Sequence, residues 1–381
     1  MIRAGEEPSL PAHISSQLAQ PEQAPAKSEP GEMRWSDHSS AVIKNHRWKM
    51  VPNMNMLILN QAEVEQLLPM SECISAMEEA LIALARGEAH QPLRTIFRPP
   101  EVKGVMAMMP TFRATPSPLF GLKAICVFPG NAAIGKDAHQ GGVLLFDGGT
   151  GELLAVINAS AITAIRTAAV SALATRLLAR EDAGDLAIIG AGVQARTHLA
   201  AMACVRPLRR VRIASRRFEN AVTFTQEMQP EFTTLIEPVE TVEAAIRGAD
   251  IIVTATTSRD PVLRREWVSP GAHINAIGTF SPKAREVDTA TMVDARLFVD
   301  RRESALNEAG DYLIAAQEGA IGPEHIRAEL GDILTGAHSG RTSPAEITLF
   351  KSLGLAIEDL AAAALVYQRA RSQAAGTSVD F

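Results

Sequence analysis

Aromatic residues, cysteine and excess positive charge are all scarce in this chain of 381 residues. Phenylalanine, tryptophan and tyrosine make up only 4% of it, too few for the stacked rings that hold single-stranded nucleic acid. The formal net charge is −6, so the basic surface that phosphate backbones require is missing as well. We therefore expect no nucleic-acid partner.

Three cysteines, Cys73, Cys126 and Cys204, stand far apart in the sequence. Their odd number and the lack of any CxxC or metal-ligand spacing predict reduced thiols and no metal site. No apolar run approaches the length of a membrane span, and Glu6 and Glu7 stand where a signal peptide needs its hydrophobic core. These features favour a cytoplasmic protein without a membrane partner.

Residues 1–53 differ from the rest of the chain. They are rich in proline, glutamine, glutamate and serine without a sustained apolar period, which predicts a disordered extension that ends near a second candidate start, Met54 or Met56. Apolar residues then recur at helical spacing up to Gly87. Short β-like runs follow, and their spacing predicts an antiparallel sheet; they are 95–97, 105–109, 121–128 and 142–147.

The most informative stretch, 185–199, reads D-L-A-I-I-G-A-G-V-Q-A-R-T-H-L. A short apolar run ends at Gly190 and a helix-compatible segment opens at Gln194, which is the strand, turn and helix of a dinucleotide-binding unit. Gly190 permits the turn, Gly192 lets a pyrophosphate approach the backbone, and Ala195 is small enough for close packing of helix on strand. The phosphates would meet the free N–H groups of the helix start.

Apolar strands and helical stretches alternate after this turn, which predicts a parallel sheet covered on both faces. The second strand, 211–215, is followed by Arg216 and Arg217, where an acid would bind the ribose hydroxyls of NAD. This favours NADPH, with NADH as the alternative, unless the two arginines simply face solvent.

Three cations interrupt apolar segments: Arg94 precedes a strand, Lys123 lies within the strand-like run L-K-A-I-C-V, and Arg166 lies in the helical segment I-T-A-I-R-T-A-A-V-S-A. A lone strand lysine often lies on the exposed side. An arginine among small apolar residues, in contrast, requires a buried anionic partner. Beside a cofactor cleft, such charges suit a substrate that bears a carboxylate.

The C-terminal third is expected to be helical. Segments 303–316 and 324–334 look like helices, and 343–373 predicts one long apolar helix that starts at Ser343, Pro344 and Glu346. Such a helix could return to the first domain or build a subunit interface.

Five motifs together resemble the ornithine cyclodeaminase/mu-crystallin family: H-Q-G-G-V-L-L-F-D (139–147), I-T-A-I-R-T-A-A-V-S-A (162–172), G-A-G-V-Q-A (190–195), H-I-N-A-I-G (273–278) and E-I-T-L-F-K-S-L-G (346–354). The resemblance covers about residues 54–373. It implies an α/β fold in which a Rossmann dinucleotide-binding domain (171–321) is inserted into a discontinuous α+β substrate-binding and dimerisation domain (54–170 and 322–381). It also implies a homodimer.

The resemblance assigns roles to single positions. Arg94, Lys123 and Arg166 match the positions that hold the substrate carboxylate, with Arg166 also close to the cofactor. Ser352 and Leu353 match positions that close the site, Ser352 at the cofactor and Leu353 at the substrate. The other positions that match cofactor contacts are Val193, Gln194, Ser215, Thr256, Ile274, Asn275, Ala276 and Ile277.

One position departs from the family pattern. The cyclodeaminases carry an Asp after H-I-N-A-x-G that acts on the substrate amine, whereas this chain has Phe280. A phenylalanine neither accepts a proton nor pairs with an ammonium group, so it favours a ring as its neighbour. The stretch G-T-F-S-P-K-A-R-E-V-D is similar to the family's imine reductases, which reduce cyclic ketimine carboxylates.

The resemblance therefore predicts NAD(P)H-dependent reduction of Δ1-pyrroline-2-carboxylate to L-proline, or of the six-membered Δ1-piperideine-2-carboxylate to L-pipecolate. Arg94 and Arg166 would bind the carboxylate, Phe280 would contact the ring, and Lys123 would orient the substrate and supply or relay a proton to its nitrogen. Three alternatives stay open: an alanine or other amino-acid dehydrogenase, an ornithine cyclodeaminase, and a crystallin-like protein that binds NADPH without turnover.

Overall fold

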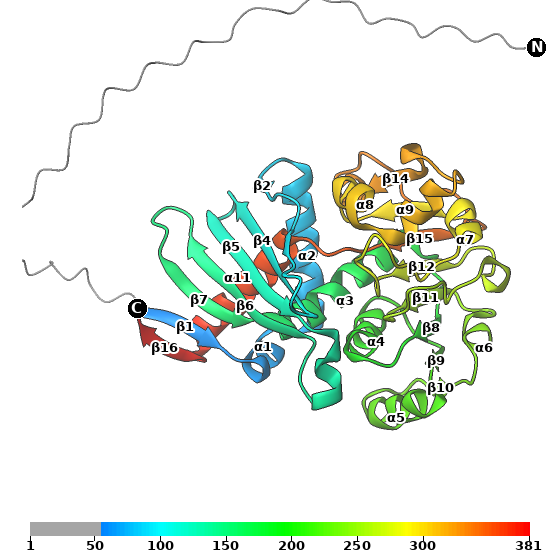
Figure 1. Ribbon diagram of the computed structural model, residues 1–381, viewed down its shortest axis with the longest axis horizontal. Coiled ribbons are helices and arrows are strands. Elements are labelled where there is room, and N and C mark those ends of the chain that lie inside the picture. The colour runs from blue at the N-terminus through cyan, green and yellow to red at the C-terminus, as the bar shows by residue number, and fades with distance from the viewer. Residues whose placement is uncertain (1–54) are drawn as a thin grey trace, which may run out of the picture. The chain divides into compact units, whose positions relative to one another are not determined.

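A computed structural model of the chain describes residues 55–381, so the extension predicted at 1–53 lies outside the described residues. Two eight-stranded sheets organise this part of the chain (Figure 1). The first is mostly antiparallel and the second is parallel throughout. This is the α/β architecture that the sequence predicted.

The first sheet has the strand order β16-β1-β7-β6-β5-β4-β2, with β3 paired to β4. Its strands β4 to β7 form the antiparallel array that the β-like runs predicted. The strand bounds are β1 Asn55–Leu59, β2 Ala89–His90, β3 Thr95–Phe97, β4 Val105–Arg113, β5 Leu119–Val127, β6 His139–Asp147, β7 Leu153–Asn158 and β16 Thr377–Asp380.

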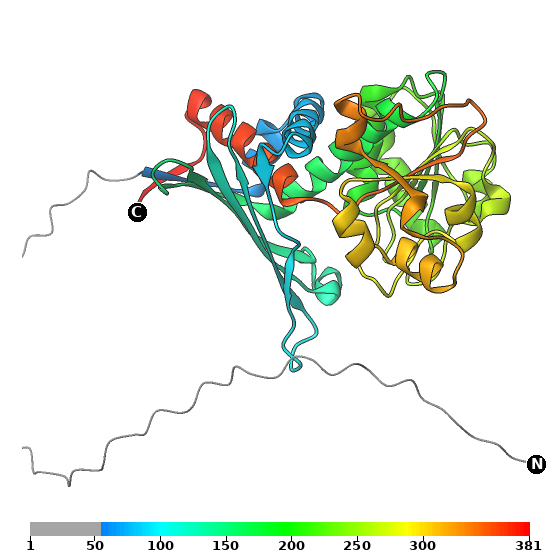
Figure 2. The same ribbon diagram turned by 90° about the horizontal axis from the view of Figure 1, so that it is seen from above.

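Helices cover one face of this sheet, as Figure 2 shows for α2 and α11. Side chains therefore alternate between buried and open along β4 and β5, because successive residues of a strand point to opposite faces. Lys123 points to the covered face and is 3% exposed, so the exposed alternative for this lysine is wrong. The helices are α1 Gln61–Leu67, α2 Met70–Ala85, α3 Ala159–Leu178 and α11 Ala356–Gln373.

The second sheet has the strand order β10-β9-β8-β11-β12-β15-β13-β14. Its strands are β8 Asp185–Ile189, β9 Arg210–Ala214, β10 Ile236–Pro238, β11 Ile251–Thr254, β12 His273–Ala276, β13 Arg296–Val299, β14 Ile326–Glu329 and β15 Thr348–Lys351. Its helices are α4 Val193–Val205, α5 Phe218–Met228, α6 Val242–Ile246, α7 Thr289–Asp294, α8 Arg302–Glu308, α9 Gly310–Gln317 and α10 Leu330–Leu334. Short 3₁₀ turns lie at η1 Pro129–Ile134, η2 Gln229–Glu231, η3 Arg265–Trp267 and η4 Pro323–His325.

The C-terminal segment corrects two expectations. The long helix predicted over 343–373 is wrong, since Thr348–Lys351 forms β15 and the helix begins only at Ala356. Likewise 326–329 forms β14 and not a helix. Four-residue buried strands carry no period that separates them from a helix turn. Both strands lie in the second sheet, although the predicted dinucleotide-binding domain ends at residue 321. The division into domains stays a prediction.

Helix α3 joins the cores of the two sheets, because it packs on α2, α11 and β6 as well as on α4 and β12. Fifteen of its 20 residues are buried. Its length and hydropathy alone would allow it to cross a membrane, contrary to the expectation that no apolar run is long enough. However, 83% of its most apolar 18-residue stretch is buried within the structure. It is therefore a core helix, and Arg166 is one of its buried residues.

Candidate functional site

The glycine turn connects β8 to α4 as predicted. Gly190 has φ +122°, and a Cβ there would lie 2.4 Å from the carbonyl oxygen of Ala255 on the neighbouring strand connection. Its need for glycine thus comes from the close approach of two backbones. Gly192, in contrast, has no atom within 4 Å of a built Cβ, which leaves space over the helix start.

The start of α4 fits a dinucleotide on observations of its own. Gly192 gives the helix no side-chain cap, so the first N–H groups stay available to a phosphate. Val193 is 57% exposed, whereas the Oε1 atom of Gln194 is buried without a hydrogen-bond partner among the described residues. The Oγ atom of Ser352 is buried and unpartnered in the same way. A bound group would supply partners to both atoms.

Ser215, Arg216 and Arg217 follow β9 directly. Ser215 is half-buried, and both arginines are exposed, with no salt bridge to any described residue. Their guanidinium groups are therefore available to an anion, although solvent is the other neighbour that this geometry allows. The choice between phosphate and solvent stays a prediction.

The strand predicted beside the nicotinamide is more deeply placed than expected. Ile274, Asn275 and Ala276 are each 0% exposed within β12, between β11 and β15, while Ile277 is half-buried at the carboxyl end of the strand. The side chain of Asn275 donates to Thr175 of α3 over 2.9 Å. Of these four residues, Ile277 alone reaches the edge where dinucleotides bind parallel sheets.

A buried carboxylate network holds the loop beyond this edge. Glu286 accepts hydrogen bonds from the backbone N–H groups of Thr256 (2.7 Å) and Gly278 (2.6 Å). Asp311 accepts from the N–H of Glu286 over 2.7 Å and pairs with Lys351 over 2.8 Å, with both side chains 0% exposed. This network fixes the segment that carries Phe280, which is 44% exposed. No local pattern in the sequence singles out these three charged residues.

The cations singled out in the sequence come together around the turn after β15. Arg94 donates to the carbonyl oxygens of Leu353 (2.8 Å) and Gly354 (3.0 Å), and a Cβ on Gly354 would lie 2.4 Å from Nη1 of Arg166. Lys123 and Arg166 share Asp359 as a partner. Three chain segments that are distant in sequence thus bring their positive charges to one place.

Arg166 does have the buried anionic partners that its apolar surroundings required. Its Nη1 lies 2.8 Å from Oε2 of Glu358 and its Nε lies 2.9 Å from Oδ1 of Asp359. Nζ of Lys123 lies 3.1 Å from the same Oδ1 atom. The long helix expected over 343–373 gave neither acid a role in the site. Two adjacent acids in an apolar segment, opposite two buried cations, were the signal that could have found them.

Burial and charge shift the ionisation of this cluster. Burial lowers the pKa of Lys123 to about 8, against the opposing effect of Asp359. His139 is affected by the same two cations: burial, Lys123 and Arg166 together lower its pKa. Burial and both cations thus favour the neutral form of this imidazole.

Arg94 has a second task at this turn. It pairs with Glu308 of α8 over 2.9 Å, and the neighbouring Asp300 accepts from the N–H groups of Leu353 (2.6 Å) and Gly354 (2.7 Å). Arg94 on the carbonyl groups and Asp300 on the amides thus clamp the same two residues. Arg94, which was predicted to bind the substrate carboxylate, therefore donates its hydrogen bonds to the protein's own backbone in this structure.

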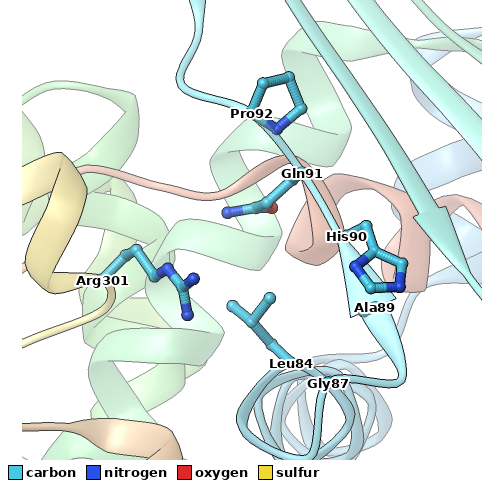
Figure 3. Close-up of a pocket in the computed structure, with 7 residues that line it drawn as sticks. All are labelled: Leu84, Gly87, Ala89, His90, Gln91, Pro92 and Arg301. Atoms are coloured by element: carbon cyan, nitrogen blue, oxygen red, sulfur yellow. The ribbon is translucent and has the colours of Figure 1, made fainter.

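A pocket of about 350 Å³ opens next to the start of α11. Figure 3 shows Leu84, Gln91 and Arg301 converging on it from three segments. Gln91 also accepts from the N–H of Ile357 over 2.9 Å, which links the pocket wall to the first turn of α11. None of the residues predicted for the site lines the pocket. Among the described residues no group of three His, Cys, Asp or Glu side chains could hold a metal ion.

Comparison with known proteins identifies the family. The model of the ornithine cyclodeaminase/mu-crystallin family matches residues 54–374. The chain belongs to this family. It is 40% identical to the mouse ketimine reductase mu-crystallin over 313 residues, 81% of this chain and 96% of the relative. It is 37% identical to a Bacillus cereus Δ1-pyrroline-2-carboxylate reductase over 327 residues, 86% of this chain and all of the relative.

Solved structures give the same result. A Thermococcus litoralis Δ1-pyrroline-2-carboxylate reductase in complex with NADH and L-proline superposes with a TM-score of 0.83 at 40% identity, over 85% of this chain and 100% of the other. An archaeal alanine dehydrogenase dimer with bound NAD gives 0.81 at 36% identity, over 86% and 100%. The predicted family and the Rossmann-type α/β fold are thereby confirmed.

Replacement of Lys351, which pairs with Asp311 in the interior, should lower the temperature at which the protein unfolds. We expect Lys351→Met to reduce stability by about 3–5 kcal/mol, because Asp311 would keep a buried charge without its partner. Thermal unfolding measures this loss. Lys283→Met changes an exposed lysine of the same loop and should leave the midpoint unchanged; equal midpoints for both variants would contradict the role given to Lys351.

Removal of the two arginines after β9 tests the cofactor preference. If they bind a 2′-phosphate, Arg216→Ala with Arg217→Ala should weaken NADPH binding about 10- to 100-fold, since charge-assisted hydrogen bonds are worth roughly 1.5–3 kcal/mol. NADH binding should stay constant. Fluorescence titration with both dinucleotides measures the ratio, and an unchanged ratio would mean that the arginines only face solvent.

Proposed function

We propose that this chain is an NAD(P)H-dependent ketimine reductase that converts Δ1-pyrroline-2-carboxylate to L-proline, or Δ1-piperideine-2-carboxylate to L-pipecolate. The observation that carries the proposal is the convergence of Arg94, Lys123 and Arg166 on the turn at Leu353 and Gly354. The names of the relatives support it, since they include ketimine and Δ1-pyrroline-2-carboxylate reductases.

The buried cations would hold the substrate by its carboxylate. Lys123 makes one hydrogen bond, to Asp359, so its ammonium group has two further N–H donors. Arg166 uses Nε and Nη1 for the protein's acids and keeps Nη2 for a ligand. Both side chains are at least 95% buried, and exclusion of water strengthens charge-assisted hydrogen bonds. These hydrogen bonds would fix the orientation of the C=N group that is attached to the carboxylate.

A dinucleotide would be held by the turn Gly190–Gly192, by Val193, Gln194 and Ala195 at the start of α4, and by Thr256, Ile277 and Ser352 at the sheet edge. When bound, its reduced nicotinamide supplies the hydride that reduces the C=N carbon. Phe280 offers an apolar surface to ring methylenes and cannot hold a distal ammonium group. We therefore favour a cyclic imine over ornithine as the substrate.

An amino-acid dehydrogenase is the second candidate, because the alanine dehydrogenase shares this fold at 36% identity. The charge cluster would hold the carboxylate of either substrate class. The two differ in the group next to the carboxylate, which is a preformed ring imine in one case and a 2-oxo acid with free ammonia in the other.

Steady-state kinetics separates these candidates. We expect NADPH or NADH oxidation with the cyclic imines, and little with pyruvate plus ammonia. Lys123→Met should lower kcat/KM for the imine by about 100-fold or more, since the carboxylate would lose a charged partner of about 1.5–3 kcal/mol and the ordering that it provides. Turnover of pyruvate plus ammonia in preference to both imines would replace the proposal with the dehydrogenase.

We also propose a cytoplasmic homodimer in which a second copy of this chain covers the open face of the first sheet. Phe97 (58% exposed), Phe120 (47%) and Met106 (41%) lie in β3, β5 and β4, and Phe97 stands opposite Met106 in the register. Apolar residues gathered on an open sheet face are typical of protein interfaces. The dimeric alanine dehydrogenase supports a second copy as the partner.

Charges on this face should separate the subunits. Phe97→Asp with Phe120→Asp removes roughly 1.5–3 kcal/mol of apolar burial per side chain, so the dimer should weaken by at least about tenfold. Sedimentation equilibrium measures the mass. Leu235→Asp changes a side chain that is 58% exposed elsewhere and should preserve the dimer. A doubly substituted protein that keeps the wild-type mass would refute this interface.

A further inference from the structure

The first turn of α11 carries two buried carboxylates, and only one oxygen of each accepts a hydrogen bond from the described residues. Glu358 is 0% and Asp359 1% exposed. Oε2 of Glu358 accepts from Nη1 of Arg166 (2.8 Å) and from the N–H of Leu355 (3.1 Å). Yet Oε1 of Glu358 and Oδ2 of Asp359 are buried without a hydrogen-bond partner among the described residues. Buried carboxylate oxygens normally have partners, so these two call for a ligand with N–H or O–H groups.

The cluster therefore offers both unused donors and unused acceptors. The donors are the remaining N–H groups of Lys123 and Arg166, and the acceptors are the free oxygens of Glu358 and Asp359. A simple anion would satisfy the donors alone. An imino acid would satisfy both, because its carboxylate and its ring nitrogen are attached to the same carbon atom.

The two acids differ in their surroundings. Oδ1 of Asp359 is shared by Lys123 and Arg166. Burial alone would raise the pKa of Asp359, but these two cations hold it below the usual range. Burial raises the pKa of Glu358 to about 8; Arg166 opposes this rise, and Asp300 adds to it as a like charge. Two acids with pKa values pushed apart are suited to different tasks.

We propose that Glu358 is the catalytic acid of the reduction and protonates the substrate's ring nitrogen from Oε1, while Asp359 stays ionised and orients Lys123 and Arg166. This inference rests on the proposed function. The O–H bond of Glu358 breaks as the N–H bond forms, so a neutral imine becomes an iminium ion and Glu358 becomes a carboxylate. Arg166 stabilises that carboxylate, which takes a proton back from water before the next turnover.

The charges that act most strongly on Glu358 lie on three segments. Arg166 lies on α3, Asp300 follows β13, and Asp359 is its neighbour on α11. Cys73 of α2 is also near, but burial raises its pKa to about 12, so it stays a neutral thiol. Arg166 favours the carboxylate form, whereas burial and the two acids favour the protonated form.

The pH dependence of kcat tests this assignment, because saturating substrate holds Lys123 charged and leaves Glu358 as the titrating group. Wild-type kcat should fall about tenfold per pH unit above pH 8. Glu358→Gln keeps the hydrogen-bonding shape but has no acid proton, so kcat should drop about 100-fold or more and lose this alkaline limb. Asp359→Asn should raise KM and keep the limb. Glu65→Gln, an exposed acid on α1, should behave as wild type.

Infrared difference spectroscopy of the protein alone gives a second readout. Wild type should show the carbonyl band of a protonated carboxyl group that disappears as pH rises through about 8, and Glu358→Gln should lack it. A Glu358→Gln variant with the wild-type pH profile, or a wild type without the band, would overturn the assignment while the reductase function stands. A wild type with the band that reduces neither cyclic imine would overturn the proposed function and the catalytic role of Glu358 together.

Discussion

The structure depends on one buried cluster of opposite charges. Arg166 and Lys123 could not be buried as lone cations, since an unpaired charge in an apolar interior is very costly. Glu358 and Asp359 offset that cost from the first turn of α11. The position of this helix on the first sheet is thereby tied to α3, and the oxygens left over are what makes the cluster more than a structural ion pair.

The fold could be predicted where residues have a strong local signature. The turn at Gly190 and the alternating strands after it gave the second sheet, and the β-like runs gave the first. Prediction failed at β14 and β15, because short buried strands have no amphipathic period. Their identity comes from neighbours that are far away in sequence: β15 fits between β12 and β13, a relation that no local pattern contains.

The site could be predicted on its cationic side but not on its acidic side. Arg166 indicated that an anion had to be near, since its surroundings are small and apolar. The sequence offered 43 acids, and only the fold selects Glu358 and Asp359 among them. The same holds for Asp311 and Glu286, which fix the loop of Phe280 through backbone N–H groups that carry no trace in the side-chain pattern.

The late position of β15 in the sequence has a consequence for how the protein is made. β15 occupies the interior of the second sheet, and β16 pairs with β1, the first described strand. Until residues 348–351 have left the ribosome, β12 and β13 therefore have no strand between them, and each keeps an unpaired edge. Closure of the second sheet must follow synthesis of β15, so the nascent chain needs protection from aggregation until that strand is available.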